Sequence, residues 1–176
     1  MVIKRRCSTS VISQGLALFY FYDKRENLFF FGHRTVDAKE NIIELIKTEI
    51  YKAIEFGCTT FYFGGYGEFD DLCYQVLTEV IRERPEFNLK RKYCVSQERF
   101  LCKKTPYFNR EDYDEVVYLV PSFDGWYKSI YFRNCAMIDN SDYVVFYAEE
   151  RQDSGAYKAL KYAKKQKDKI IVNIYN

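Results

Sequence analysis

Short runs of β-branched and aromatic residues alternate with longer segments of helical periodicity in this 176-residue chain. Six runs are typical of strands, and they lie at residues 27–31, 59–63, 89–95, 115–120, 143–147 and 170–175. Between them, apolar residues recur at three- and four-residue spacing, which predicts helices. This alternation favours a mainly parallel sheet flanked by helices on both faces. We therefore expect a single α/β domain with three layers.

The first expected helix shows the periodicity most clearly. Isoleucines recur every four residues from Ile42 to Ile54. Asp37 is in position to cap the helix, with Glu40 three residues later, and Gly57 is expected to end it. Further helices are expected from Phe69 to the residue before Pro85, within 125–142 after an initial loop, and over 154–169.

Composition limits the class of protein. Hydrophobic residues make up 48% and charged residues 30%, as in a globular domain rather than a disordered chain. The net charge of +2 argues against nonspecific nucleic-acid binding, which needs a strongly basic face. The six cysteines form no CxxC pair and the chain has one histidine, so no metal site is expected. We expect reduced thiols, a cytoplasmic location and no cofactor.

The N-terminal residues loosely resemble a signal peptide, because basic residues precede the apolar stretch VISQGLALFYFY. The uninterrupted apolar part is shorter than the roughly 20 residues that span a bilayer, and no small-residue cleavage site follows it. We interpret Leu16–Tyr22 and Asn27–Phe31 as two strands joined by a charged turn. Residues 1–26 are thus expected to form an extension or an antiparallel edge hairpin, and residues 27–176 the α/β domain, without membrane association.

Segments that follow strands of a parallel sheet converge at one edge, where ligands bind. The first such segment is Gly32-His33-Arg34, in which Arg34 would hold a phosphate in bidentate fashion. Packing of His33 and an ion pair of Arg34 explain it equally well. The second segment is rich in glycine and runs from Gly64 through Gly65 and Gly67 to Asp70. Its glycines would let backbone amides approach an anion at a helix N-terminus, although capping alone explains Asp70.

Two later segments are also candidates. Arg133 and Asn134 lie on one flank of an expected helix, with Asp139 behind them, although a surface arginine is the more common explanation for Arg133. Ser154 is a natural N-cap of the last expected helix, and Gly155 leaves the first amides of that helix uncovered. This end of the helix is therefore a second candidate phosphate site, while capping alone also explains Ser154. No residue is assigned a catalytic role.

In chain order, the motifs FFFGHR, FYFGGYGEFD, YFRNCAMIDNSDYVVFY and SGAYKALKYAKKQKDKIIVNI resemble the SLOG superfamily, and within it the bacterial YpsA-like (DUF1273-type) group. The resemblance covers most of the chain, from about Asn27 to Tyr175. It implies a Rossmann-like sandwich that binds a nucleotide or a nucleotide-derived ligand at the carboxyl ends of the strands. By position, the residues implied in binding are Gly32, His33, Arg34, Gly64, Gly65, Gly67, Asp70, Arg133, Asn134, Asp139, Ser154 and Gly155.

The superfamily includes DprA single-strand DNA-binding proteins, the "lonely guy" phosphoribohydrolases and ligand sensors of bacterial defence systems. The phosphoribohydrolases carry a PGGxGTxxE motif, whose glycines hold phosphate and whose glutamate acts at the sugar. This chain instead reads RQDSGAYKAL, with one glycine and no acidic residue in the three positions after Ala156. We therefore expect a sensor or sequestering module rather than an enzyme. Cleavage of an N-glycosidic bond, DprA-like binding of single-stranded DNA and a scaffold role remain alternatives, and a homodimer fits each of them.

Overall fold

A computed structural model describes residues 26–37, 39–101, 108–120, 126–150 and 154–175. The strands in these ranges are β1 (Asn27–Gly32), β2 (Thr60–Phe63), β3 (Lys90–Cys94), β4 (Glu115–Val117), β5 (Tyr143–Tyr147) and β6 (Ile170–Asn173). The α-helices are α1 (Lys39–Phe56), α2 (Glu68–Glu83), α3 (Trp126–Asp139) and α4 (Gly155–Ala163). Short 3-10 helices lie at Pro85–Phe87, Glu98–Phe100 and Arg110–Asp112.

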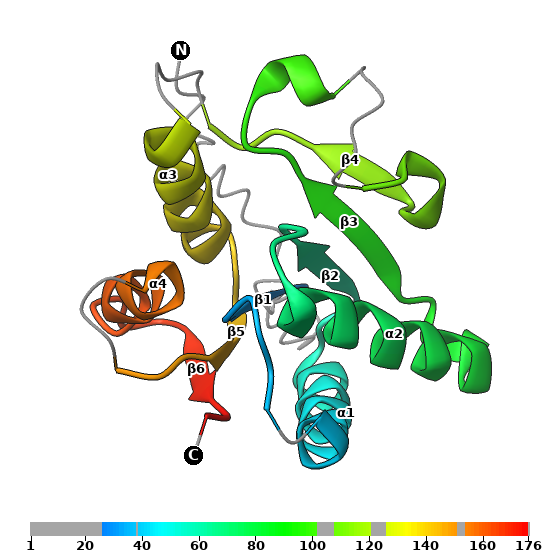
Figure 1. The fold of residues 1–176 in the computed structure, drawn as a ribbon. Helices are drawn as coiled ribbons and strands as arrows, with labels where there is room; N and C mark the ends of the chain where they lie inside the picture. The colour runs from blue at the N-terminus through cyan, green and yellow to red at the C-terminus, as the bar shows by residue number, and fades with distance from the viewer. Residues whose placement is uncertain (1–25, 38, 102–107, 121–125, 151–153, 176) are drawn as a thin grey trace, which may run out of the picture.

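The six strands form one parallel sheet in the order β4-β3-β2-β1-β5-β6 (Figure 1). Helices α1 and α2 cover one face of this sheet, and α3 and α4 cover the other. The expected α/β sandwich of Rossmann-like type is therefore confirmed, including the parallel sheet and the helices on both faces.

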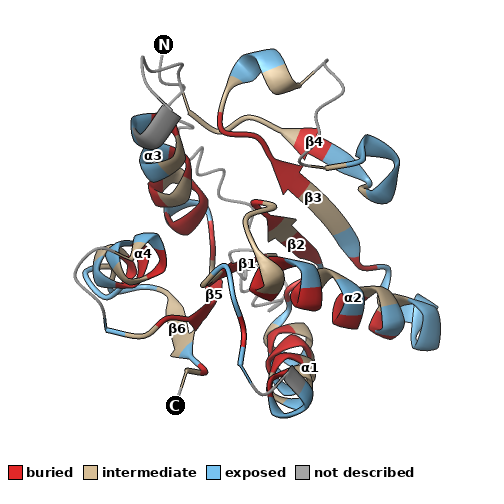
Figure 2. Ribbon diagram, in the orientation of Figure 1, coloured by how far each residue is buried: buried red, intermediate tan, exposed pale blue. Residues whose placement is uncertain are grey.

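Two hydrophobic cores form because successive side chains of a strand point to opposite faces of the sheet. Leu28 and Phe30 of β1 pack in the core under α1 and α2, whereas Phe29 and Phe31 pack in the core under α3 and α4. Figure 2 shows the buried residues on the strands and on the inward faces of the helices. Burying each such phenylalanine contributes about 1.5–3 kcal/mol to folding, so much of the aromatic content of the chain has a structural explanation.

Strand β1 lies in the middle of the sheet. Its Phe29 is in register with Tyr62 of β2 on one side and with Val144 of β5 on the other. A strand formed by Leu16–Tyr22 therefore cannot pair with β1, and this part of the predicted hairpin is wrong. Residues 1–25 lie outside the described residues, and an N-terminal strand at an edge of the sheet stays a prediction.

Among the elements that are shorter than expected, β4 and α4 differ most. The fourth strand was expected to extend to Val120, but β4 ends at Val117, which pairs with the last residue of β3, Cys94. Strand β3 ends at Cys94, so β4 has no residue of β3 to pair with after Val117. The last helix ends at Ala163, its final buried alanine, because the polar residues that follow have no apolar face to pack.

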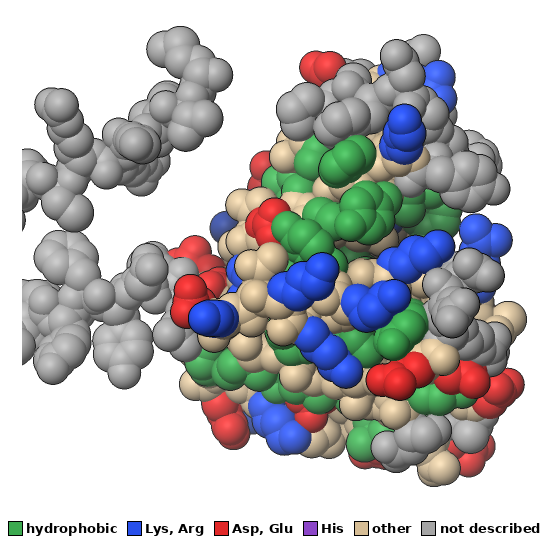
Figure 3. All heavy atoms as spheres, turned by 90° about the vertical axis from the view of Figure 1, so that its left-hand side faces the viewer, with side chains coloured by type: hydrophobic (Ala, Val, Ile, Leu, Met, Phe, Trp, Pro, Cys, Tyr) green, Lys and Arg blue, Asp and Glu red, His purple; other side chains and the backbone are tan. Residues whose placement is uncertain are grey.

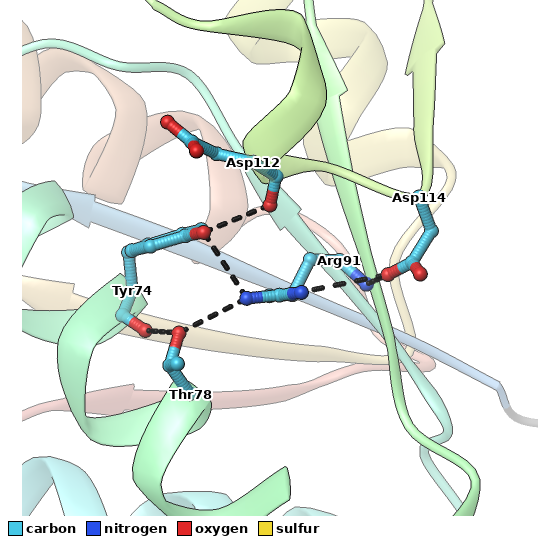
Figure 4. Close-up of polar contacts among 5 residues, drawn as sticks. All are labelled: Tyr74, Thr78, Arg91, Asp112 and Asp114. Carbon is cyan, nitrogen blue, oxygen red and sulfur yellow. Dashed lines mark hydrogen bonds and ion pairs between the residues drawn. The ribbon is translucent and has the colours of Figure 1, made fainter. Parts of the chain in front are cut away.

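Arg91 of β3 holds the β4 edge of the sheet to helix α2 (Figure 4). Its Nη1 donates to Tyr74 Oη at 3.1 Å and to Thr78 Oγ1 at 3.2 Å, both on α2. The Arg91 backbone N–H donates to Asp114 Oδ2 at 2.7 Å, and Tyr74 Oη donates to the Asp112 carbonyl at 2.8 Å. The half-buried guanidinium of Arg91 thus connects β3 to helix α2, and the Arg91 backbone connects β3 to the residue before β4.

Cysteines in the described part of the chain are buried and not disulfide-bonded, as expected for Cys58, Cys73, Cys94 and Cys135. Among the helices that the structure describes, none has the length and apolarity needed to cross a membrane.

Candidate functional site

The chain changes direction across the sheet at β1. From β1 it adds β2, β3 and β4 on one side, and it then returns to place β5 and β6 on the other side. The segments after β1 and β5 therefore leave neighbouring strands for opposite faces, and this is where open α/β sheets bind ligands. His33 follows β1, Glu149 follows β5, and Ser154 and Gly155 begin α4. We call these four residues the switch-point rim.

His33 joins the segments of the switch-point rim. The backbone N–H of Glu149 donates to His33 Nε2 at 2.7 Å, and His33 Nδ1 lies 3.3 Å from Ser154 Oγ. Because Nε2 accepts, this hydrogen-bond pattern assigns the imidazole proton to Nδ1, which then donates to Ser154. The ring also packs edge-on against Tyr147 and Tyr175, at centroid distances of 6.1 and 5.9 Å. His33 therefore positions the start of α4 rather than acting as a base towards Ser154.

Ser154 caps helix α4 as predicted. Its Oγ accepts a hydrogen bond from the backbone N–H of Tyr157 at 3.3 Å. With His33 as a second donor, the oxygen accepts twice, so the hydroxyl proton points towards other acceptors. A Cβ built on the exposed Gly155 would meet no atom within 4 Å. Among the described residues, none thus crowds Gly155 at the start of α4, and the helix dipole favours an anion there.

The glycine-rich segment after β2 differs from this arrangement, because the protein itself fills it. The backbone amides of Gly65 and Tyr66 both donate to Asp70 Oδ2, the second at 3.1 Å. The Asp70 carboxylate therefore occupies the position that a ligand phosphate would take. Burial raises the pKa of Asp70 to about 6, while these two hydrogen bonds and the charge of Arg133 act in the opposite direction.

The glycines of this region make room for other parts of the protein. A Cβ on Gly67, which has φ of 110°, would lie 2.5 Å from the Arg34 Cα, and a Cβ on Gly32 would lie 2.3 Å from the Phe69 ring. The N–H of Glu68 donates to the Arg34 carbonyl at 3.0 Å, so the segments after β1 and β2 pack backbone to backbone. The Arg34 side chain itself is exposed.

Arg133 is buried, with 3% of its surface exposed. Its Nη1 donates to the Gly64 carbonyl at 2.9 Å and to the Cys94 carbonyl at 3.4 Å. Its Nε and Nη2 donate to Asn134 Oδ1 at 3.2 and 3.0 Å, and its guanidinium carbon lies 5.2 Å from the centre of the Tyr66 ring. These contacts join α3 to the ends of β2 and β3. Arg133 thus stabilises the backbone that follows β2 and the end of β3. A direct contact between Arg133 and a phosphate stays a prediction.

Asp139 lies away from the other predicted residues. It is the last residue of α3, and its carbonyl accepts from Lys169 Nζ at 2.9 Å, just before β6 begins. Because α3 runs antiparallel to the strands, its C-terminus lies at the amino edge of the sheet. The structure therefore brings together His33, Ser154 and Gly155 at the rim, and Gly32, Arg34, Gly64, Gly65, Gly67, Asp70, Arg133 and Asn134 beside it.

Glu149 was not predicted from the sequence, although its position directly after a buried strand would have suggested it. Its contribution here is its backbone N–H, which has no residue-specific signal. Tyr147 and Tyr175 were likewise missed, because their contact with His33 depends on the order of the strands.

No protein-family model matches this sequence, and no curated protein matches it. Among solved structures, the chain is similar to the X-ray structure of DNA processing protein A (DprA) from Streptococcus pneumoniae, with a TM-score of 0.58 at 13% sequence identity. The match covers 85% of this chain and 50% of the DprA chain, so this chain spans about half the length of that structure. At this identity the likeness shows the Rossmann-like fold alone.

Proposed function

We propose that this chain is a SLOG-type binding module of the YpsA-like kind, which holds a nucleotide-derived ligand at the switch-point rim. The observation that carries the proposal is the open N-terminus of α4 at the place where the strand order reverses. A phosphate there would accept from the amides that follow Ser154 and from the Ser154 hydroxyl. The structural neighbour, DNA processing protein A, is by its name a protein that acts on DNA, which is a polymer of nucleotides.

Positive charge at this edge supports a phosphate-bearing ligand. The exposed Arg34 directly follows His33, and it is well suited to bidentate contact with phosphate. Carboxylates also lie nearby, because Glu149 and Glu150 follow β5. Carboxylates repel phosphate but accept hydrogen bonds from sugar hydroxyls, as they do in Rossmann dinucleotide sites. A ligand that carries both a phosphate and a ribose therefore fits this edge better than inorganic phosphate.

Binding without turnover is the form of the proposal that the contacts favour. Cleavage of an N-glycosidic bond needs a general acid and a charge that stabilises the sugar cation. His33 is engaged at both ring nitrogens, and Asp70 is buried against two amides of its own segment. The arrangement thus supports a sensor or a sequestering module.

The experiment is a thermal-shift titration with AMP, ADP, ADP-ribose and ribose 5-phosphate, in which each mixture is also assayed for released base. A ligand at 100 times its dissociation constant stabilises the fold by about 2.7 kcal/mol, which raises the Tm by about 5–10 °C in a chain of this size. Gly155→Leu should abolish the shift and leave the Tm without ligand near that of the wild type. Gln75→Leu, on the exposed face of α2, adds the same side chain elsewhere and should keep the shift.

A shift without free base supports the binding module. A shift with free base would replace it by the phosphoribohydrolase alternative. No shift with any compound, or an equal shift in Gly155→Leu, would overturn the proposal.

A further inference from the structure

Helix α3 lies on the left in Figure 1, the side of the molecule that faces the viewer in Figure 3, and it exposes two neighbouring aromatic rings. Tyr131 is 44% exposed and Phe132 is 38% exposed, and in the described part of the chain they are the large hydrophobic residues that stand out of the surface. Their rings contact each other edge to face, with centroids 5.6 Å apart. The hydrophobic side chains that the core needs are buried elsewhere on α3, at Met137 and Ile138.

The flank of helix α3 that carries Tyr131 lies beside helix α4. The Tyr162 hydroxyl donates to the Asp139 carboxylate at 2.9 Å, and this bond raises the pKa of Tyr162 to about 12. Tyr131, Cys135 and Asp139 follow one another at four-residue spacing and therefore share one flank of α3. The flank of α3 that carries Tyr131 therefore faces Tyr162 of α4.

Lysines line the exposed face of α4 next to Tyr162. Lys158 and Lys161 lie on the exposed face of α4, and Lys165 lies in the turn that follows the helix; all three are exposed. The opposite face of α4 is buried at Ala156, Ala159, Leu160 and Ala163. Figure 3 shows hydrophobic side chains on this side of the molecule with a group of lysine and arginine side chains beside them. We call Tyr131, Phe132, Lys158, Lys161, Tyr162 and Lys165 the α3/α4 face.

The positive charge of the α3/α4 face indicates which kind of partner can bind there. A second copy of the chain that met this face with its own would bring like charges together. The N-terminal 25 residues are also basic, with five lysines and arginines against one aspartate. Protein–protein interfaces are depleted in lysine, and their cores are larger and more apolar than two rings. A polyanion that also offers flat apolar surfaces fits the face better than any of these.

We propose that the α3/α4 face binds single-stranded nucleic acid, with bases stacked on Tyr131 and Phe132 and phosphates along Lys158, Lys161 and Lys165. Exposed rings beside a positive row are the features by which proteins hold single strands without reading sequence. Lys158 and Lys161 are about 4.5 Å apart along the axis of α4, which is close to one phosphate spacing of a stacked strand. Bases in a duplex are already stacked and cannot reach the rings, so a single strand is the expected form.

Fluorescence anisotropy with labelled 20-nucleotide dT and rU oligomers tests this proposal over a series of salt concentrations. Replacing Lys158, Lys161 and Lys165 together by Gln should lower the slope of log affinity against log salt by about 2, at about 0.7 for each lost phosphate contact. The matched control replaces Arg82, Lys90 and Arg99 by Gln, since these are exposed and lie on other elements. The control should keep the slope of the wild type.

The rings are tested separately. Tyr131→Leu with Phe132→Leu keeps an apolar surface but removes stacking, and it should weaken binding by about fivefold or more. A duplex of mixed sequence should compete poorly with the single strand. The variant Gly155→Leu separates this site from the switch-point rim, because it should leave oligomer binding unchanged.

Several outcomes would overturn the proposal. These are no binding of either oligomer, equal loss in the lysine and control variants, or full affinity after removal of both rings. Binding to phosphatidylserine vesicles without oligomer binding would assign the face to an anionic membrane instead. Preference for dT over rU, or the reverse, would distinguish DNA from RNA as the source of the strand.

Discussion

Replacing Gly67 by alanine tests the contact between the segments after β1 and β2. Gly67 has φ of 110° and ψ of 174°, a region that essentially only glycine occupies. A Cβ there would lie 2.5 Å from the Arg34 Cα, and that atom belongs to the backbone rather than to a flexible side chain. The conformation costs about 1–3 kcal/mol for any other residue, and overpacking against a fixed neighbour costs about 1–3 kcal/mol. We expect Gly67→Ala to lose about 2–6 kcal/mol in total.

Urea unfolding followed by far-UV circular dichroism measures this loss. The midpoint should fall while the m-value stays constant, and the Tm should drop by roughly 5–15 °C. Gly155→Ala is the control, because its new methyl group meets nothing within 4 Å. That variant should be as stable as the wild type or up to about 1 kcal/mol more stable. If the two variants unfold at the same urea concentration, the backbones of Gly67 and Arg34 are not in contact and the reasoning fails.

Three further changes follow from buried polar groups. Burial raises the pKa of Asp70 from 3.8 to about 6, so the folded state holds this proton more tightly and stability should fall as pH rises from about 4 to about 6. That loss is about 3 kcal/mol and should be missing in Asp70→Asn when urea unfolding is measured across this range; identical pH profiles would contradict it. Arg133→Ala leaves the buried Gly64 and Cys94 carbonyls without their donor and should cost about 2–4 kcal/mol, and an unchanged Tm would refute this structural role. Arg91→Ala and Tyr74→Phe should show a coupling energy of about 0.5–1.5 kcal/mol in a double-mutant cycle, whereas strict additivity would mean that the network in Figure 4 contributes nothing.

Helix α1 shows what periodicity alone predicts well. Isoleucines at four-residue spacing fix one apolar face, and in the structure Ile42, Ile46 and Ile50 are buried there. The strand-like runs were recognised for a similar reason, because a buried parallel strand is apolar on both faces. The expected end of β4 was wrong because the length of an edge strand depends on its neighbour, and β3 stops at Cys94.

The candidate site was predicted less completely. The glycine segment after β2 has the composition of a phosphate site, but the carboxylate of Asp70 occupies its amides. Glycine spacing does not distinguish a turn that receives a ligand from one that receives the protein's own side chain. Arg133 was expected at the rim, but it is buried because carbonyls 69 and 39 residues away in sequence accept from it.

Local sequence determined which segments of this protein form strands and helices, and which side chains face the two cores, because these depend on short-range periodicity and on the alternation of strand faces. The order of the strands depends instead on long-range pairing and on which helix packs over which face. Only the tertiary structure placed β5 beside β1, and so brought His33 into contact with Ser154, 121 residues away in the chain. It also decided that the carboxylate of Asp70 accepts from the amides of Gly65 and Tyr66, whereas a side chain added at Gly155 would meet no described atom within 4 Å, because an acceptor fills a turn only where it lies at the right distance in space.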